Sequence, residues 1–479
     1  MIKGSNQIRN ILMAAMLLLS FSVQSSEPSD NHIVLNPAER LQTIEGWGSS
    51  LCWWAAQVGK WDEQKMDDVV NLITAPDKLN MNIFRYNIGG GDDPSHADGH
   101  MVKGKGKRAE MEGFKASPTA PYDWNADKAQ RTIMMKIKAK RPDAIFEAFS
   151  NSAPYWMTFS GCSAGNDDPL KDNLKPEYYD MFCDYLVDVC KHYHDAYQLD
   201  FRTLEPFNES YSNYWYNQGS QEGCHFEPST QIEIIHRLYP KLQASGLNTV
   251  IAASDETNLN QFLTVQHAYQ AAEDIWSKVG QFNTHTYSGT DVERAEVHKL
   301  VESSGKRFWQ SETGPSEGRG FESNLMLLQK MFDDLRIMRP VAWLDWQMVE
   351  EHNGEWCVIS GDFKTQEYKT VKNYFVQMQI TRFIKAGYTL IETNQKNVLA
   401  AISPSGKELV VALLNRGKGS QDFNIDLNKA GKVNSISCWR TSKTEDCLHI
   451  ASPKVKKGVL STQCPGQSVT TFRLQIGKN

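Results

Sequence analysis

The chain has 479 residues, of which 40% are hydrophobic, with a net charge of −6 and a pI near 6.1. This acidic balance excludes a general nucleic-acid-binding protein, because such proteins carry a surplus of lysine and arginine to neutralise phosphates. The length exceeds that of one ordinary domain and suits one large domain with a smaller one beside it.

The N-terminal residues 1–25 are predicted to be a signal peptide. Lys3 and Arg9 form a basic start, and an apolar run follows over residues 11–23. That run is short for a membrane span, which needs about 20 apolar residues, although a membrane anchor is the alternative interpretation. We therefore expect a secreted or periplasmic protein that has no membrane span after cleavage.

In chain order, residues 26–46 predict short strands, since Ile33 and Leu35 alternate with polar neighbours. Residues 47–384 alternate strand-like apolar runs with helical periodicity, the pattern of a (β/α)8 barrel. The expected barrel strands lie at 47–54, 82–88, 144–149, a segment before Glu209, 249–253, 282–287, 307–312 and 341–346, and the expected helices at 62–72, 127–140, 176–197, 230–244 and 371–383.

The texture changes after about Ile384. Short alternating segments at 409–414, 423–427 and 472–476 are separated by Gly, Asn and Ser turns. This spacing predicts an antiparallel β-sandwich over residues 385–479. The fold class is therefore α/β, a TIM barrel with an associated β-sandwich.

Two glutamates stand at the ends of predicted barrel strands. Glu209 follows a strand that Pro206 ends, because proline has no N–H for the ladder. Glu312 follows an apolar segment and precedes Gly314. The glutamates are 103 positions apart, about three βα units of roughly 31 residues each, which suits strands four and seven. Most glutamates are solvated surface residues, but two carboxyls facing across a barrel mouth are what a glycosidase needs.

Further segments carry a family resemblance. Gly46-Trp47-Gly48-Ser49-Ser50, Asn82-Ile83-Phe84-Arg85-Tyr86, His285-Thr286-Tyr287, Asn208-Glu209 and Trp309-Gln310-Ser311-Glu312 all resemble glycoside hydrolase family 30. The similarity runs from about Ile44 to the end of the chain. The Trp53-Trp54 pair and the run Gly89-Gly90-Gly91 look most like its endo-β-1,6-galactanase branch.

The resemblance implies a retaining mechanism with Glu209 as general acid/base and Glu312 as nucleophile. It further implies that Asn208 binds the sugar 2-OH, and that Arg85 pairs with Glu312 and keeps the pKa of that carboxyl low. Tyr287 should donate to Glu312, with His285 beside it. From the residues alone, the alternatives are that Arg85 is a surface arginine and that His285 is a core histidine.

Aromatic and acidic residues are expected to bind the sugar. The resemblance implies that Trp156 and Trp346 wall the −1 sugar. The resemblance further implies that Trp53 and Trp54 do the same, unless one of them belongs to the core, and that Asp92 is a sugar-binding carboxylate. The loop after Glu209 is rich in aromatic residues, Tyr211, Tyr214, Trp215 and Tyr216, which suggests a platform for sugar rings.

No cofactor and no metal are expected. His192 and His194 lie two positions apart on a predicted helix and therefore face different sides. The nine cysteines leave the pairing open, since export permits disulfides. Cys162 could pair with Cys224, and two of Cys438, Cys447 and Cys464 could pair.

These observations predict a hydrolase for β-1,6-galactan, the side chains of arabinogalactan. The alternatives are another β-glycanase or an exo-β-glycosidase of the same family, acting on β-1,6-glucan, β-galactoside, β-glucoside or β-xylan. A third alternative is a non-catalytic glycan-binding barrel protein. The expected partner is a polysaccharide or oligosaccharide, with no nucleic acid, and the chain is expected to be a monomer.

Overall fold

The computed structural model describes residues 31–96, 111–315 and 317–477. The predicted signal peptide lies outside these residues. Within them, no helix is both long enough and apolar enough to cross a bilayer.

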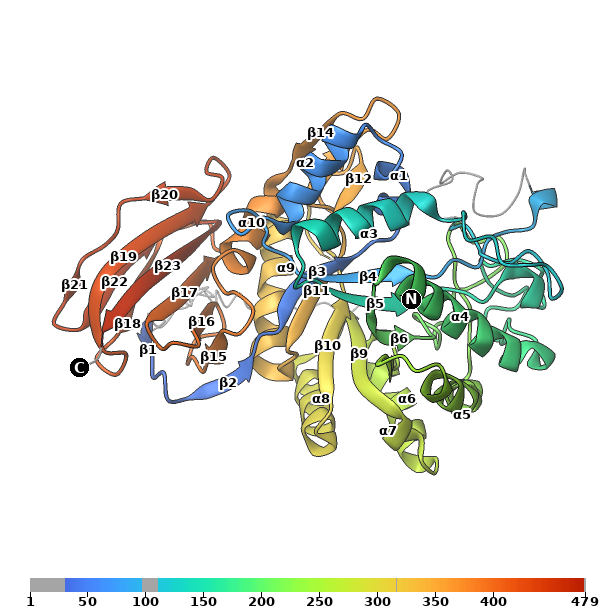
Figure 1. The fold of residues 1–479 in the computed structure, drawn as a ribbon. Coiled ribbons are helices and arrows are strands. Elements are labelled where there is room, and N and C mark those ends of the chain that lie inside the picture. Colours follow the sequence, from blue (N-terminus) through green and yellow to red (C-terminus); the bar gives the residue numbers. More distant parts are fainter. Residues whose placement is uncertain (1–30, 97–110, 316, 478–479) are drawn as a thin grey trace, which may run out of the picture. The chain divides into compact units, whose positions relative to one another are not determined.

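Eight parallel strands close into a barrel, which confirms the predicted fold class (Figure 1). In order around the ring they are β3 (Gly46–Ser50), β4 (Ile83–Asn87), β5 (Ile145–Phe149), β6 (Phe201–Glu205), β7 (Val250–Ala252), β9 (Val279–Ser288), β10 (Arg307–Glu312) and β11 (Ala342–Gln347). The ring closes because β9 pairs with β10 and β11 pairs with β3. A further short strand, β8 (Glu256–Asn258), lies beside β9.

Helices alternate with the barrel strands. They are α1 (Trp54–Val58), α2 (Glu63–Thr74), α3 (Lys128–Lys140), α4 (Tyr179–Tyr197), α5 (Pro228–Ala244), α6 (Leu259–Ala271), α7 (Ile275–Lys278), α8 (Asp291–Ser304), α9 (Phe321–Asp333) and α10 (Lys372–Thr381), with short turns at Pro94–His96, Tyr155–Met157, Pro176–Tyr178 and Asp334–Met338. In α3 the buried residues Ile133, Met134 and Ile137 form the expected apolar stripe.

Helices α1, α6, α7, α8 and α9 were not predicted. Helix α8 buries only Arg294, Val297 and Val301, so its apolar stripe is too sparse to recognise. Its N-terminus is nevertheless encoded locally. Thr290 and Glu293 form a capping box, in which each side chain accepts a hydrogen bond from the other residue's backbone N–H.

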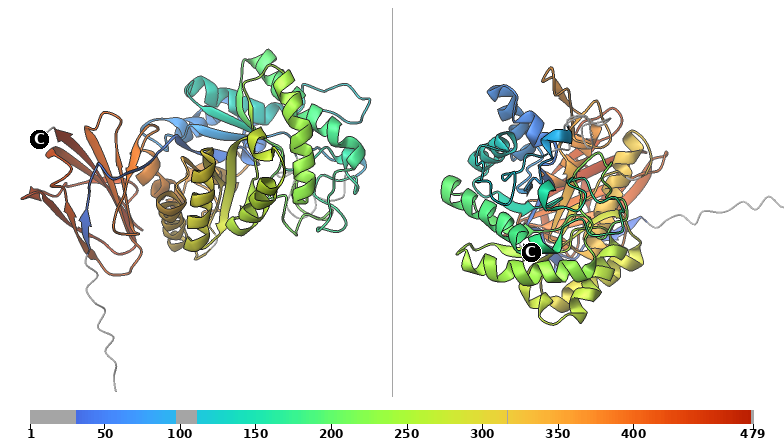
Figure 2. Two further views of the ribbon diagram at one scale, coloured as in Figure 1. Left: turned by 90° about the horizontal axis from the view of Figure 1, so that it is seen from below. Right: turned by 90° about the vertical axis from the view of Figure 1, so that its right-hand side faces the viewer.

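The C-terminal strands form a sandwich of two mostly antiparallel sheets. One contains β1 (His32–Val34), β18 (Gln421–Asp426), β22 (Val459–Cys464) and β21 (Val455–Lys456). The other contains β2 (Arg40–Thr43), β15 (Thr389–Ile391), β16 (Val398–Ile402), β17 (Glu408–Asn415), β23 (Ser468–Gly477), β19 (Lys432–Thr441) and β20 (Leu448–Ile450). The N-terminal strands take part, since β1 pairs with β18 and β2 with β15; Figure 2 shows blue β1 among red strands.

The loop after β11 carries a small sheet of its own. It consists of β12 (Val349–Glu351), β13 (Ile359–Gly361) and β14 (Tyr368–Thr370). The segment between β12 and β13 is therefore held at both ends by this sheet, which follows the carboxyl end of the eighth barrel strand.

The nine cysteines are all buried free thiols. The Sγ of Cys162 accepts a hydrogen bond from the N–H of Ala164 at 3.3 Å, and the thiol of Cys224 faces the carbonyl of His225 at 3.8 Å. The two pairings left open by the sequence are therefore not formed. Burial raises the pKa of these thiols, to about 12 for Cys162 and Cys224, and so keeps them protonated.

Candidate active site

Glu209 lies just beyond β6, the fourth strand of the barrel. Its φ is 51°, in the left-handed region that non-glycine residues seldom adopt. Two contacts hold this backbone: its N–H donates to the carbonyl of Asp255 at 2.6 Å, and its own carbonyl accepts from Trp215 Nε1 at 2.8 Å. Conformations of this kind persist only where the surroundings impose them, and they cluster at functional sites.

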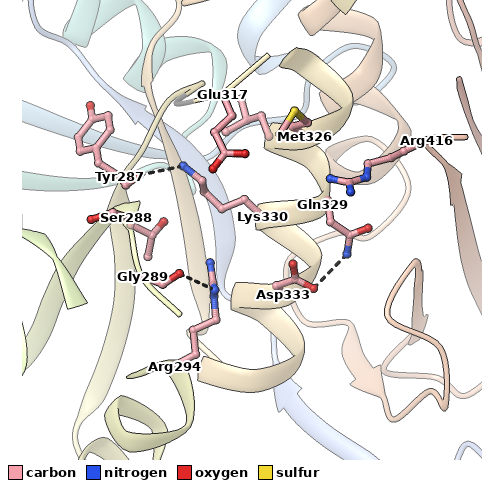
Figure 3. Close-up of a pocket in the computed structure, with 12 residues that line it drawn as sticks. Tyr287, Ser288, Gly289, Arg294, Glu317, Met326, Gln329, Lys330, Asp333 and Arg416 are labelled. Atoms are coloured by element: carbon pink, nitrogen blue, oxygen red, sulfur yellow. Dashed lines mark hydrogen bonds between the residues drawn. The ribbon is translucent and has the colours of Figure 1, made fainter. Parts of the chain in front are cut away.

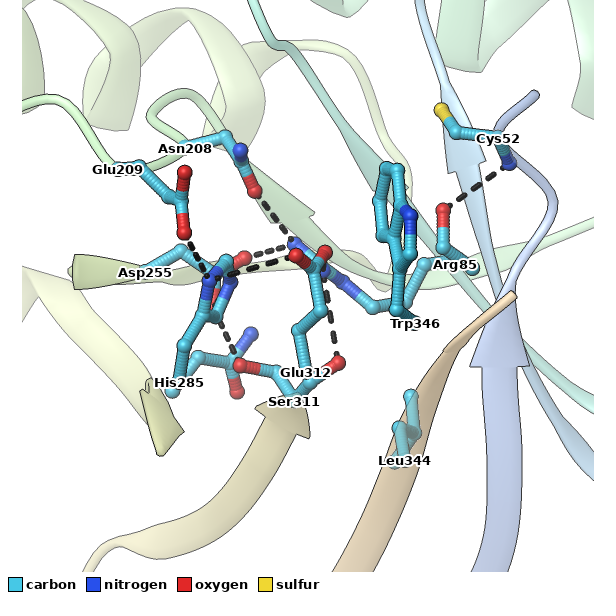
Figure 4. Close-up of polar contacts among 12 residues, drawn as sticks. Cys52, Arg85, Asn208, Glu209, Asp255, His285, Ser311, Glu312, Leu344 and Trp346 are labelled. Carbon is cyan, nitrogen blue, oxygen red and sulfur yellow. Dashed lines mark hydrogen bonds and ion pairs between the residues drawn. The ribbon is translucent and has the colours of Figure 1, made fainter. Parts of the chain in front are cut away.

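Glu312 is the last residue of β10, the seventh barrel strand, as the spacing predicted. Its Oε2 accepts from Arg85 Nη1 at 3.0 Å, and its Oε1 accepts from the hydroxyl of Tyr287 at 2.9 Å. One oxygen of Glu312, one oxygen of Glu209 and a ring nitrogen of His285 lie within 4.8 Å of one another. The two glutamates thus converge at one end of the barrel (Figure 4).

Arg85 is fully buried and faces three carboxylates. Its Nε donates to Glu147 at 2.9 Å, its Nη1 to Glu312 at 3.0 Å, and its Nη2 to Asp255. Nη2 also lies 3.4 Å from the side-chain oxygen of Asn208, which fixes the direction of that amide. One positive charge is therefore shared among three buried negative groups.

The predicted effect of Arg85 on the pKa of Glu312 needs a correction. Arg85 does pair with Glu312, but it does not hold the pKa of that carboxyl low. Burial raises the pKa of Glu312, and the opposing effects of His285 and Arg85 are smaller. The reason is that Arg85 divides its charge among three partners in a site from which water is excluded.

His285 is buried at the centre of the cluster. Its Nδ1 lies 3.0 Å from Glu209 Oε1 and 3.6 Å from Glu312 Oε1. Its Nε2 lies 3.2 Å from Asp255 Oδ1. The ring therefore fixes Glu209 and Glu312 relative to each other and to the end of β7.

Tyr214 holds the other oxygen of Glu209. The hydroxyl of Tyr214 donates to Glu209 Oε2 at 2.6 Å and lies 2.8 Å from the hydroxyl of Thr257. The adjacent Trp215 is buried, whereas Tyr216 is exposed. The aromatic loop predicted as a sugar platform thus supports Glu209 with two of its members.

The predicted tryptophans lie in different surroundings. Trp346 is half-buried, and its backbone N–H donates to the carbonyl of Thr313, the residue after Glu312, at 2.7 Å (Figure 4). Its ring meets that of Trp53 edge-on at 5.9 Å. Trp156 donates its Nε1 to the carbonyl of Lys115 at 2.7 Å. Trp54 is the core residue of its pair: it is fully buried, and its Nε1 donates to the carbonyl of Ser50 at 2.9 Å. Because Trp54 has no free ring face, its predicted role in sugar binding is wrong.

Asp92 lies apart from the carboxylate cluster. It lines a separate cavity of about 430 Å³ together with Asp123 and Tyr155. That cavity is bordered by the run Gly90 to Gly91, so it adjoins the end of β4. The sugar-binding role of Asp92 stays a prediction.

Sequence reasoning missed two carboxylates of the site, Glu147 and Asp255. Glu147 lies in the middle of β5 and also accepts from Thr203 and Asn283. Asp255 follows β7 and accepts from the hydroxyl of Ser311, which immediately precedes Glu312. A signal was present in both carboxylates, because a charge inside or directly after a buried strand needs a partner.

The donor atoms could also be considered for a metal. Glu209, His285 and Glu312 form the one set of metal-ligating groups found among the described residues. Arg85 already places a positive charge 3.0 Å from Glu312, which disfavours a cation there.

Another hollow of about 370 Å³ lies behind Tyr287 (Figure 3). Lys330 reaches from α9 across this hollow and donates to the carbonyls of Tyr287 and Gly314 at 3.4 and 3.3 Å. Of the described residues that line it, none belongs to the carboxylate pair. Lys330 therefore supports the ends of β9 and β10 from outside the carboxylate cluster.

Residues 30–315, more than half of the chain, match the family model described as O-glycosyl hydrolase family 30. The chain belongs to this family. It is accordingly an O-glycosyl hydrolase, and its substrate is a carbohydrate.

The predicted resemblance to the endo-β-1,6-galactanase branch is confirmed as well. The chain is 29% identical to an endo-β-1,6-galactanase of Hypocrea rufa, over 98% of this chain and 99% of that protein. It is 26% identical to an exo-β-1,6-galactobiohydrolase of Bifidobacterium longum, over 82% of this chain but 35% of that longer protein. A conserved exported protein from Bacteroides fragilis has the same fold, with a TM-score of 0.78 at 19% identity, covering 92% of this chain and 99% of its own.

Proposed function

We propose that this family 30 enzyme is a retaining endo-β-1,6-galactanase that cleaves the side chains of arabinogalactan. The observation that carries the proposal is that one carboxyl oxygen of Glu209 and one of Glu312 lie within 4.8 Å of each other, at the ends of strands four and seven. Carboxyls that act by double displacement stand about 5–5.5 Å apart, whereas inverting enzymes need about 6.5–9.5 Å for an intervening water. The full-length similarity to a fungal endo-β-1,6-galactanase supports the substrate.

In this proposal Glu312 attacks the anomeric carbon while Glu209 gives its proton to the glycosidic oxygen. The bond between carbon and leaving oxygen breaks, and an ester bond to Glu312 forms. Glu209, now ionised, takes a proton from water, whose oxygen attacks the anomeric carbon and releases Glu312. Two inversions return the sugar to its original configuration.

The neighbouring side chains would orient these two groups. Arg85 and Tyr287 each hold one oxygen of Glu312, which fixes the plane of the nucleophile. Asn208 accepts from Arg85 through its oxygen, so its amide N–H groups remain as donors for the sugar 2-OH. Trp346, Trp53, Trp156 and Asp92 are proposed to contact the sugar.

The experiment that tests the proposal uses a linear β-1,6-galactan and de-arabinosylated arabinogalactan. We expect a ladder of oligosaccharides at early times, and NMR of the first product should show the β-anomer. A first product of α configuration would exclude double displacement. Release of galactobiose alone would favour the exo alternative, since the Bifidobacterium relative is an exo-β-1,6-galactobiohydrolase.

A non-catalytic glycan-binding barrel is the rival from another class. It predicts that the protein binds galactan without cleaving any β-glycan. Measuring product release and binding on the same preparation separates the two, because the enzyme must release product that a Glu312→Gln variant does not.

We also propose that the chain is exported and acts as a monomer. The basic start and apolar run of residues 1–25 support export. Within the mature chain, the proposed boundaries are strands at 26–46 that join the sandwich, the barrel at 47–384 and the sandwich at 385–479. Sequencing the N-terminus of the mature protein and measuring its mass in solution would test cleavage and oligomeric state.

A further inference from the structure

Trp356 lies at the rim of the site and has no role in the mechanism above. It belongs to the loop between β12 and β13, and 37% of its surface is exposed. An exposed indole is unusual, because tryptophan buries more apolar area than other side chains. Its exposed surface is therefore a candidate contact for a ligand.

Two contacts place this indole beside Glu312. Its ring stacks against that of Tyr287, with centroids 6.4 Å apart and planes at 29°, and Tyr287 donates to Glu312. The ring also lies close to Gly314: a Cβ at that glycine would stand 2.7 Å from the indole. Only the absence of a side chain two residues after Glu312 allows this approach.

The backbone before Trp356 is also fixed. The side-chain oxygen of Asn353 accepts from the N–H groups of Glu355 and Trp356 at 2.8 and 3.0 Å. The carboxylate of Glu355 accepts from the N–H of Gly320 at 2.7 Å, which ties this loop to the start of α9. The indole is thus presented from an anchored loop, which lowers the entropy lost when a ligand stacks on it.

We infer that Trp356 is the stacking platform of a subsite next to the one that Glu312 serves, and that it binds a second hexose of the galactan chain. The apolar faces of sugar rings stack on aromatic rings, and Trp346 already stands on the wall beside Glu312. Trp346 belongs to β11 and Trp356 to the loop between β12 and β13, and in this inference the two rings serve successive sugar units. This inference rests on the proposed function and adds a specificity determinant to it.

The test compares kcat/KM on β-1,6-galacto-oligosaccharides of increasing length. Trp356→Ala should lower the value for the longest oligosaccharide by about tenfold, since loss of one stacked ring is worth on the order of one such factor. The shortest oligosaccharide that the enzyme cleaves should change by less than about twofold, and Trp356→Phe should keep most of the length dependence.

Leu448→Ala is the matched control, because it removes an apolar side chain that is 50% exposed on β20 of the sandwich. It should leave the kinetics unchanged. An equal loss on long and short substrates would overturn the inference, since it would mean that Trp356 only positions Tyr287 and Glu312. Unchanged kinetics in Trp356→Ala would overturn it too. Wild-type protein that cleaves no galactan would instead defeat the proposed function.

Discussion

Glu209 and its neighbour Glu205 should respond differently to replacement by glutamine. Both are buried, but Glu205 has an oxygen without a hydrogen-bond partner. Burial raises the pKa of Glu205 well above its usual range, which favours the neutral form of this carboxyl in the folded protein. Glutamine is a close mimic of a neutral glutamic acid, which makes Glu205 a control for Glu209.

Glu209→Gln should therefore lower kcat/KM by about 10²–10⁴-fold, the usual contribution of a general acid/base. Glu205→Gln should stay within a few-fold of wild type. Steady-state kinetics on galactan would check both variants, with circular dichroism as the test of folding. Equal losses in the two variants would contradict the role assigned to Glu209.

Tyr214 is expected to orient Glu209. Its hydroxyl donates to Glu209 Oε2 at 2.6 Å and lies 2.8 Å from the hydroxyl of Thr257. Tyr214→Phe removes this donor, so the carboxyl should be less well oriented and kcat/KM on galactan should fall by up to about 10²-fold. Unchanged steady-state kinetics in this variant would contradict the orienting role. Tyr216→Phe, at an exposed position in the same loop, is the control.

At the scale of elements, the loop between β6 and α5 links the packing around Gly223 to the position of Glu209. Gly223 lies against the ring of Trp215: a Cβ there would stand 2.0 Å from the indole. Trp215 in turn donates to the carbonyl of Glu209, the residue with the left-handed backbone. A change at Gly223 is therefore transmitted to Glu209 through one side chain.

Gly223→Ala should destabilise the protein by about 1–3 kcal/mol, the usual cost of overpacking, and lower kcat by up to about 10²-fold. Gly419→Ala is the control, because nothing lies within 4 Å of a Cβ at that position. Denaturant unfolding and kinetics on the same samples would check the prediction. Full activity in Gly223→Ala would show that Trp215 can move without displacing Glu209.

The elements also show what the sequence can and cannot predict. Strands β6 and β10 were predictable because each couples an apolar run to a breaker, Pro206 or Gly314. Helix α8 was missed because it buries few apolar residues. In the site, Asn208, Glu209 and Glu312 stand in recognisable local patterns, whereas Asp255 and Glu147 are linked to them only by the closure of the barrel.

At the scale of the whole molecule, buried carboxyls should make stability depend on pH. Burial raises the pKa of Glu222 to about 8, and those of Asp127 and Asp345 to about 7. In the unfolded chain these groups lose their protons near their ordinary values of 4.5 and 3.8. Between about pH 4 and 8 the folded chain therefore binds more protons, and the free energy of unfolding falls as the pH rises.

Unfolding in denaturant at pH 5 and pH 8 would check this dependence, with the lower midpoint expected at pH 8. Glu222→Gln should reduce the difference by up to a few kcal/mol, because glutamine has no proton to lose. Acids with a lowered pKa, such as Asp143 beside Arg141, act below pH 4 and do not oppose the trend. A midpoint that rises towards pH 8 would contradict the assignment.

Because Arg85 is shared among three carboxylates, we expect the native enzyme to be less stable than a variant with one carboxylate fewer. Glu312→Gln removes one of three anions that compete for this single cation, while its amide oxygen can still accept from Arg85 and its amide N–H can face Tyr287. We expect this inert variant to melt at a higher temperature than the native enzyme, as scanning calorimetry would detect. A variant that is more stable and does not cleave its substrate would also be the preferred form for crystallising the complex with an uncut galactan chain.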